Sequence, residues 1–350
     1  MIVRIQNKMS HLFLDGSDLQ GREAEVLEDA SKKLNFIPKK LIDRSNWWSS
    51  KEIGAFRYEG EFKGRKAVLK IQGVKPATSE IYMIQSFSKD NKSRILRPPL
   101  LYSFLPWDDK KRYEALVLEF IPGKKIVNSP TNRNEIKAFF NLREEYKRNC
   151  AINPWIDKPS ESLSGEIKIN FTKWREASYR LYPTHSFREK DDEKLIDQAI
   201  EILEKAYRGV ESEFQHGHFS AGDLYKVSEN EIVILSNLYW SWKPPFYDAV
   251  FGYHWFIYHL ANLPNASPEL IEEQRDLWLS KINSLANLRT HLKGAKLKLL
   301  NLAFLERAAA GLNLDALSVD LKSPIAEYLV EETRESLKEL IEKCRGSESN

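Results

Sequence analysis

Cysteine is scarce in this chain, which has two among its 350 residues, Cys150 and Cys344. The two lie far apart in the sequence and outside any spacing typical of a metal site, so the sequence predicts two free thiols. This excludes a small scaffold that is held together by disulfides. Unlinked thiols are typical of a reducing compartment, and we therefore expect a cytoplasmic protein.

Long apolar runs and an excess of one charge are missing as well. Nowhere do about 18 consecutive apolar residues occur, so the sequence predicts no membrane span. Residues 1–15 include Arg4, Lys8 and Asp15, and we expect no export signal there. The 53 Lys and Arg residues against 50 Asp and Glu residues leave a net charge of +3, which is too balanced for a nucleic-acid-binding surface. Membranes and nucleic acids are therefore not expected as partners.

What is present is an ordinary globular composition, 42% hydrophobic and 29% charged, with two kinds of hydrophobic periodicity. Strands are expected at 55–58, 61–62, 65–72, 100–105, 113–120, 225–227 and 231–235. Helices are expected at 16–35, 79–87, 132–149, 172–182, 191–208, 248–260, 268–288, 295–310 and 324–343. This order predicts an α+β fold with an N-terminal lobe over 1–121, which holds a leading helix and a five-stranded sheet, and a helical lobe over 122–350.

Lys70 stands in the middle of the apolar strand Ala67–Ile71. A lysine is costly to bury without an anionic partner, and Glu80, at the start of the following helix, is the candidate. Together they would place an ammonium group against nucleotide phosphates. The alternative is that Lys70 occupies the solvent face of an alternating strand.

A second apolar strand ends abruptly at the sequence Ile121-Pro122-Gly123. The backbone N–H and C=O groups at such a strand end suit a flat heterocycle such as adenine. An ordinary strand terminus is the alternative.

The segment 215–227, QHGHFSAGDLYKV, has the layout of a kinase-type catalytic loop. An apolar strand follows it, and Tyr247-Asp248 then opens an apolar helix. In such a loop one carboxylate orients the attacking hydroxyl, and further oxygen ligands hold the metal that bridges the nucleotide phosphates.

His216 is expected to pack under the loop. For Asp248 we favour a helix N-cap over a metal ligand. The aromatic residues between 239 and 258 would line a substrate site or, as we prefer, pack in the core.

Three segments in this order, AVLKI, LEFIPG and the HGHFSAGDLYKV loop with PPFYD after it, resemble the aminoglycoside phosphotransferase and choline kinase family. The resemblance spans roughly 55–260. It implies a two-lobed protein-kinase-like fold with a small antiparallel β-sheet lobe, a mainly helical lobe, and ATP bound between them. It places Lys70 and Glu80 near the phosphates, and it places Glu119, Phe120 and Ile121 at the adenine.

The catalytic loop departs from the family pattern, which is His-Gly-Asp, four residues, Asn, and then a strand that ends in Asp. Here His218 takes the position of the base, and Asp223 takes that of the Asn. The metal-binding Asp maps to Ser236 or, one residue later, to Asn237. The resemblance thus implies His218 and Asp223 as catalytic residues, with Asp223 and Asn237 or Ser236 at Mg²⁺, an ion that prefers oxygen ligands.

Two functions follow from these residues. The first is a divergent phosphotransferase that binds ATP and Mg²⁺ and transfers the γ-phosphoryl group to the hydroxyl of a small molecule. A neutral imidazole at His218 would accept a proton near neutral pH, although it lacks the negative charge of a carboxylate. The alternative is a catalytically inactive pseudokinase that serves as a nucleotide sensor or binds a protein partner.

Overall fold

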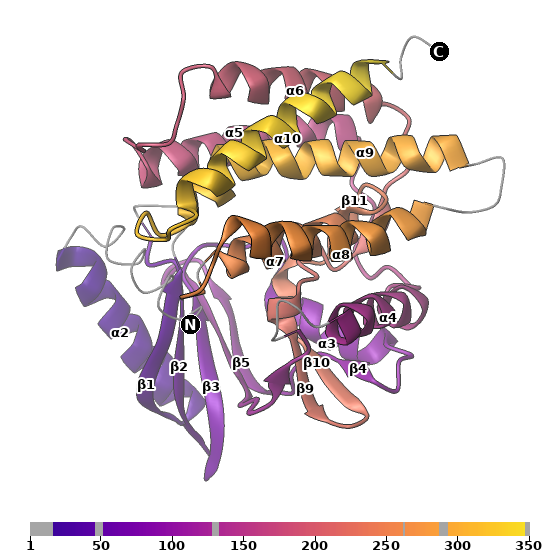
Figure 1. The fold of residues 1–350 in the computed structure, drawn as a ribbon. Coiled ribbons are helices and arrows are strands. Elements are labelled where there is room, and N and C mark those ends of the chain that lie inside the picture. Colours follow the sequence, from indigo (N-terminus) through magenta and orange to yellow (C-terminus); the bar gives the residue numbers. More distant parts are fainter. Residues whose placement is uncertain (1–16, 46–51, 128–132, 262, 287–292, 347–350) are drawn as a thin grey trace. The chain divides into compact units, whose positions relative to one another are not determined.

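The computed structural model describes residues 17–45, 52–127, 133–261, 263–286 and 293–346 (Figure 1). The expectation of no export signal concerns residues 1–15, which lie outside the described residues. The chain groups into two compact units, Met1–Lys124 with Tyr225–Leu238, and Lys125–Leu224 with Tyr239–Asn350. A lobe boundary after residue 121 stays a prediction.

The first unit is built on a five-stranded antiparallel sheet with strand order β1-β2-β3-β6-β5. A second sheet has the order β4-β10-β9-β7, in which β4 and β10 are parallel. The strands are β1 (Phe36–Ser45), β2 (Ala55–Phe62), β3 (Arg65–Gln72), β4 (Leu96–Arg97), β5 (Leu101–Asp108), β6 (Tyr113–Glu119), β7 (Lys124–Lys125), β9 (Leu224–Ser228) and β10 (Glu231–Ile234). The helices are α2 (Ser17–Leu34) and α3 (Glu80–Asp90).

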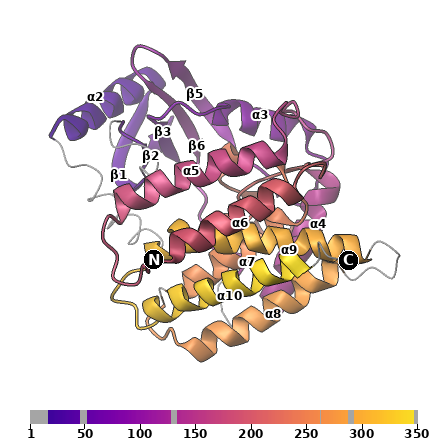
Figure 2. The same cartoon turned by 90° about the horizontal axis from the view of Figure 1, so that it is seen from above.

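One helix covers each face of the five-stranded sheet, and Figure 2 shows the strands between α2 and α3. Successive side chains of β3 point to opposite faces of the sheet, and those of Leu69 and Ile71 lie in the core beneath α2. Leu116 of β6 packs on the opposite face against Ile81 and Ile84 of α3. Because Lys70 lies between Leu69 and Ile71, and opposite Leu116 in the register, it belongs to the face that α3 covers.

Local chemistry explains the turns of this unit. Gly64 has a φ of 75° in the two-residue turn between β2 and β3, a conformation that glycine adopts without strain. Ser79 is the N-cap of α3, where its hydroxyl accepts a hydrogen bond from the backbone N–H of Ile81 at 3.2 Å. The predicted strand at 65–72 and the predicted cap at Ser79 are confirmed.

The second unit is mainly helical. The helices α5, α6, α9 and α10 run side by side, as both views show, and α7 and α8 pack against α9 (Figures 1 and 2). A short antiparallel pair, β8 with β11, joins Gln215 to Ser241. The elements are α4 (Arg133–Asn149), α5 (Leu163–Leu181), α6 (Asp192–Ala206), β8 (Glu213–Gln215), β11 (Ser241–Lys243), α7 (Tyr247–Leu260), α8 (Pro268–Ala286), α9 (Lys293–Ala310), a π-helical turn (Gly311–Asp315) and α10 (Ala326–Gly346).

The short strands β4, β7, β8 and β11 were not expected from the sequence, and two larger differences concern β1 and α5. The strand β1 was not expected, because Pro38 and two lysines interrupt its pattern. It forms at the edge of the sheet, with a register shift beside Pro38, where a proline and charged residues are tolerated. Helix α5 begins at Leu163 rather than near 172, and Ser162 caps it by accepting from the N–H of Gly165.

Two further findings concern the cysteines and the apolar character of the helices. Cys150 and Cys344 are buried thiols that form no disulfide within the described residues, and burial raises the pKa of the Cys150 thiol to about 12. Within the described ranges, no helix has the length and apolar character that crossing a membrane requires.

Candidate functional site

In the first unit, the site begins with an ion pair between a strand and a helix. The ammonium group of Lys70 on β3 donates a hydrogen bond to Oε2 of Glu80 at the start of α3. The side chains are 15% and 4% exposed, so the pair lies under the helix rather than in bulk solvent. The partner expected for Lys70 is therefore present, and the solvent-face alternative for Lys70 is wrong.

A second carboxylate lies beside this pair. Glu114 of β6 is fully buried, and its Oε2 accepts a hydrogen bond from the hydroxyl of Ser79 at 2.7 Å. Its Oε1 accepts a longer one, 3.4 Å, from the N–H of Glu80. Burial raises the pKa of Glu114, and these two donors counteract part of that rise. The only sequence signal for Glu114 is an acidic residue near the start of the mainly apolar segment YEALVLEF.

The strand end expected at the adenine is held by an arginine. Arg97 of β4 donates from Nη1 and Nη2 to both carboxylate oxygens of Glu119, and from Nε to Glu231 at 2.5 Å. The N–H of Leu100 donates to the same Glu119 carboxylate at 2.9 Å. The side chain of Glu119 is thus a structural anchor that fastens this strand end to β4, and contact of the strand end with a base stays a prediction.

The next two candidates at the adenine follow Glu119 directly. The ring of Phe120 lies under the ammonium group of Lys66, 3.6 Å from the ring centroid. Ile121 is half-buried. Their contact with a nucleotide stays a prediction.

The candidate metal ligands after β10 also lie in the first unit. Ser236 has a φ of 59°, a left-handed conformation that is uncommon for a residue with a side chain. Asn237 is buried, and its Nδ2 donates to the carbonyl oxygen of Ile234 at 2.9 Å. Both residues thus lie in a sharp turn at the end of a buried strand.

In the second unit, the catalytic-loop-like segment is held from below. The backbone N–H of His216 donates to the hydroxyl oxygen of Tyr146 at 2.9 Å, and the buried imidazole packs edge-on against Trp240. The predicted packing role of His216 is confirmed. Gly217 has a φ of 71°, and a Cβ there would stand 2.2 Å from the carbonyl oxygen of Tyr239, so the loop requires glycine at this position.

The segment brings His218 and Asp223 together. Nδ1 of His218 lies 2.8 Å from Oδ2 of Asp223, and the hydroxyl of Ser220 donates to the same oxygen at 2.5 Å. Burial lowers the pKa of the nearby Lys125 ammonium, and the charge of Asp223 counteracts this. Asp223 is therefore surrounded by donors and positive charge.

Three aromatic rings surround His218. Tyr239 stacks on the imidazole with 4.8 Å between ring centroids, and Phe251 and Trp255 lie at 4.7 and 5.6 Å. Most other aromatic side chains of α7 are buried in the core. Packing in the core is thus confirmed for most of the aromatic residues of α7, and a substrate site lined by the rings around His218 stays a prediction. On the same helix, burial lowers the pKa of His259 to about 4, so its imidazole is neutral near neutral pH.

The expectation that Asp248 is the N-cap residue of α7 is wrong, although its Oδ1 accepts a hydrogen bond from the backbone N–H of Ala249 at 2.8 Å, in the first turn of the helix. The N-cap residue is Phe246, whose φ is 67°, and Asp248 lies in the first turn. Its Oδ1 accepts from Nε and Nη2 of Arg143 on α4 at 3.0 and 2.9 Å, and its N–H donates to the side chain of Gln215 at 3.1 Å. An acidic residue at the start of a helix can be either an N-cap or one half of a buried ion pair. Here the packing of α4, which carries Arg143, decides for the ion pair.

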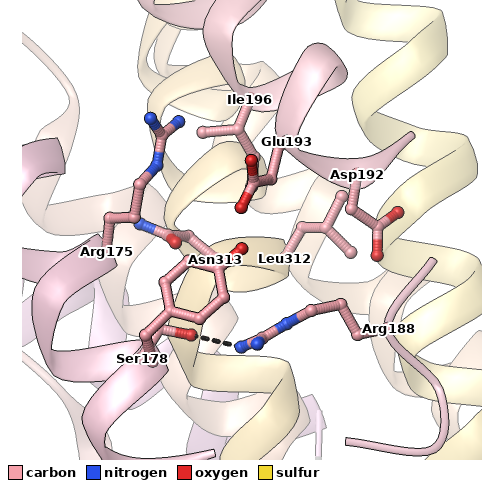
Figure 3. A pocket seen from close by; sticks show the side chains of 9 residues that line it. Arg175, Ser178, Arg188, Asp192, Glu193, Ile196, Leu312 and Asn313 are labelled. Carbon is pink, nitrogen blue, oxygen red and sulfur yellow. Dashed lines mark hydrogen bonds between the residues drawn. The ribbon is translucent and has the colours of Figure 1, made fainter. Parts of the chain in front are cut away.

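A separate pocket lies between α5, α6 and the π-helical turn (Figure 3). Arg188 donates to the hydroxyl of Ser178 at 2.7 Å, and Asp192, on the same pocket wall, pairs with Arg334. Nδ2 of Asn313 has no hydrogen-bond partner in the described part of the chain. The pocket has a volume of about 10 Å³, which is room for roughly one water molecule, so it is too small for a substrate.

The candidate metal ligands Asp223, Ser236 and Asn237 would all bind a metal ion through oxygen atoms. Within the described ranges, no cluster of three or more His, Cys, Asp or Glu side chains could hold a metal ion. Mg²⁺ that arrives with a nucleotide needs only one or two carboxylates, because phosphate oxygens and water complete its shell. Taken one by one, Asp223 in the second unit offers a carboxylate, and Asn237 or Ser236 in the first unit offers an amide or hydroxyl oxygen, which are donors of this kind.

Comparison with solved structures identifies the fold. Amicoumacin kinase in complex with AMP-PNP, Ca²⁺ and Ami has a TM-score of 0.57 with 15% identity, covering 93% of this chain and 96% of that chain. Choline kinase from Cryptosporidium parvum Iowa II has a TM-score of 0.55 with 15% identity, covering 88% and 90%. A thermostable mutant of aminoglycoside phosphotransferase APH(4)-Ia, in a ternary complex with ADP and hygromycin B, has a TM-score of 0.51 with 11% identity, covering 90% and 95%.

The chain therefore has the kinase-like fold of the aminoglycoside phosphotransferases and choline kinases, and the predicted fold class is confirmed. No protein-family model matches the sequence, and no curated protein matches it. Identities of 10–15% establish a shared fold and leave the activity to be argued from the residues.

Proposed function

We propose that this protein binds ATP with Mg²⁺ and transfers the γ-phosphoryl group to a hydroxyl of a small molecule. The observation that carries the proposal is the buried ion pair between Lys70 and Glu80. In protein kinases, a strand lysine paired with a helix glutamate must be in place for phosphoryl transfer. Amicoumacin kinase and the APH(4)-Ia mutant, which share the fold, were solved with AMP-PNP and with ADP.

The second unit supplies a base for this reaction. Because Nδ1 of His218 faces the carboxylate of Asp223 at 2.8 Å, we assign the Nδ1–H tautomer, which leaves Nε2 as the proton acceptor. The proton of the attacking hydroxyl would pass to Nε2 as its oxygen bonds to the γ-phosphorus and ADP leaves. Asp223 would stabilise the imidazolium that forms, as the carboxylate of a Ser-His-Asp triad does.

The remaining candidate residues complete the proposed site. The backbone at Glu119, Phe120 and Ile121 would contact the adenine. The candidate ligands for Mg²⁺, which would neutralise charge on the phosphates, are Asp223 and either Asn237 or Ser236.

The first test replaces the lysine that would contact the phosphates. ATP at about 100 times its dissociation constant stabilises a protein by about 2.7 kcal/mol, and Lys70→Met is expected to remove most of this stabilisation. The measurement is a thermal-shift titration with ATP and Mg²⁺. Lys39→Met, which removes an exposed lysine paired with Glu61, is the control and should respond like wild type. A wild-type protein that shows no shift at millimolar ATP contradicts the proposal.

The metal ligands are tested by a different change. Asp223→Asn keeps the size of the side chain and removes its charge, so the part of the ATP-induced stabilisation that depends on Mg²⁺ should be lost. The titration is made with and without Mg²⁺, and Asp197→Asn, from an exposed ion pair with Arg175, is the control. If Asp223→Asn keeps the full wild-type response to Mg²⁺, Asp223 is not a metal ligand.

A second function, a pseudokinase that senses nucleotide, is favoured by one observation. Oδ2 of Asp223 already accepts the hydroxyl of Ser220 and contacts His218, and no carboxylate stands at the base position itself. The two functions differ in turnover. A thermal shift with ATP but no ATP consumption over a panel of amino sugars, cholines and sugars supports the sensor.

A further inference from the structure

Glu114 is a buried carboxylate that forms no ion pair in the described part of the chain. It is fully buried on β6, on the face of the sheet that α3 covers. Its neighbour on that face, Leu116, packs against Ile81 and Ile84. An apolar side chain would fill position 114 without the penalty of burying a charge, so packing alone does not explain a carboxylate there.

The hydrogen bonds of Glu114 are made to the first turn of α3. Ser79 donates its hydroxyl proton to Oε2 of Glu114 at 2.7 Å and accepts from the N–H of Ile81 at 3.2 Å. The N–H of Glu80 points to Oε1 of Glu114 at 3.4 Å. The first N–H groups of a helix have no partners within the helix and attract negative charge, so this carboxylate fastens the start of α3 to the sheet.

The same turn carries the partner of Lys70. Glu80 follows the cap residue directly, and its carboxylate accepts from Lys70 on β3. Because β3 and β6 are adjacent and Lys70 lies opposite Leu116 in the register, Lys70 and Glu114 lie on one face under one helix end. A shift of the first turn of α3 would therefore separate Glu80 from Lys70.

We propose that Glu114 is a positioning residue, which fixes the first turn of α3 so that Glu80 holds Lys70 in place for nucleotide phosphates. The second half of this inference rests on the proposed nucleotide binding, and the first half concerns the nucleotide-free protein alone. Burial and the charge of Glu80 raise the pKa of Glu114, while Ser79, the N–H of Glu80 and the charge of Lys70 lower it. These groups surround the carboxylate.

The test compares Glu114→Gln with wild type by amide hydrogen exchange of the full-length, nucleotide-free protein. The expected result is about 10-fold faster exchange at the N–H groups of Glu80 and Ile81, because the charge-assisted hydrogen bonds are lost. Val117→Ala, on the same strand but in the core beneath α2, is the matched control. It weakens the sheet from the other face and should leave the two amides unchanged. Unchanged exchange in Glu114→Gln overturns the proposal.

A second measurement addresses the nucleotide. ATP·Mg²⁺ affinity, from thermal-shift titration, should fall about 10-fold in Glu114→Gln and stay at the wild-type value in Val117→Ala. Faster exchange with unchanged ATP affinity overturns the link to Lys70. If wild type does not bind ATP, the proposed function fails, and the exchange result alone decides whether Glu114 positions α3. Should Glu114→Gln fail to fold, Ser79→Ala, which removes the bridging hydroxyl, takes its place, and its exchange is compared at the N–H of Glu80, because Ser79 itself caps the N–H of Ile81.

Discussion

Asp248→Ala is expected to lower the free energy of unfolding by about 3–5 kcal/mol. The substitution leaves the buried guanidinium of Arg143 without its buried negative partner, so that only Glu144, whose side chain is 45% exposed, still pairs with it. Arg143 is 6% exposed and Asp248 is not exposed at all, so water cannot replace the lost carboxylate. Urea denaturation followed by circular dichroism measures the change.

Two comparisons isolate the cause. Asp197→Ala, which breaks the exposed ion pair with Arg175, should cost about 0–1 kcal/mol. The double variant Arg143→Met with Asp248→Leu removes both charges and should regain most of the stability, because an apolar pair of similar size does not need a partner. A double variant as unstable as Asp248→Ala would show that the cost arises from lost packing.

The pair also predicts how stability responds to acid. Burial alone would raise the pKa of Asp248, but Arg143, and then Lys147, hold it below its usual value. A carboxyl group with a lowered folded-state pKa stabilises the protein above its unfolded pKa, which is about 3.9. The stability that Asp248 contributes is lost as the pH falls through its lower pKa in the folded protein.

The second large effect is expected at His218. If Nε2 accepts the proton of the attacking hydroxyl, His218→Ala should reduce turnover by about 10²–10⁴-fold, the usual contribution of a positioned base. Nucleotide affinity should stay near the wild-type value, because the imidazole would contact the acceptor. The measurement is ATP consumption over the panel of amino sugars, cholines and sugars, with affinity from thermal shift.

His185→Ala is a suitable control for His218→Ala. His185 also belongs to the second unit, and its Nδ1 accepts from the N–H of Phe187 at 3.3 Å, away from the catalytic-loop-like segment. It should leave turnover unchanged. Wild-type turnover that survives in His218→Ala contradicts the role of a base.

The ion pair of Lys70 with Glu80 shows what a sequence can predict. An apolar strand with one lysine and a capped helix that opens with an acid are both local patterns, and each has a direct physical meaning. The short connection between this strand and this helix then favours an ion pair between Lys70 and Glu80. The loop at 215–223 was predictable for the same reason, since its residues stand next to one another in the chain.

Asp248 and Glu114 show where such reasoning ends. An acid at the start of a helix is compatible with a cap and with an ion pair, and Arg143 is more than 100 residues away in the chain. Glu114 is an acid near the start of the mainly apolar strand β6, and its role depends on which helix end packs on that strand. Strand β1 belongs with these cases, because pairing with β2 overrides its weak pattern.

The sequence by itself determined the class of fold and the order of its candidate site residues, because periodicity, caps and turns depend on residues that are close together in the chain. Only the tertiary structure decided which charges meet inside the protein. It pairs Asp248 with Arg143, places Asp223 against His218, and sets Glu114 beneath the first turn of α3. The physical reason is that burial makes an unpaired charge costly, and packing determines which distant partner relieves that cost.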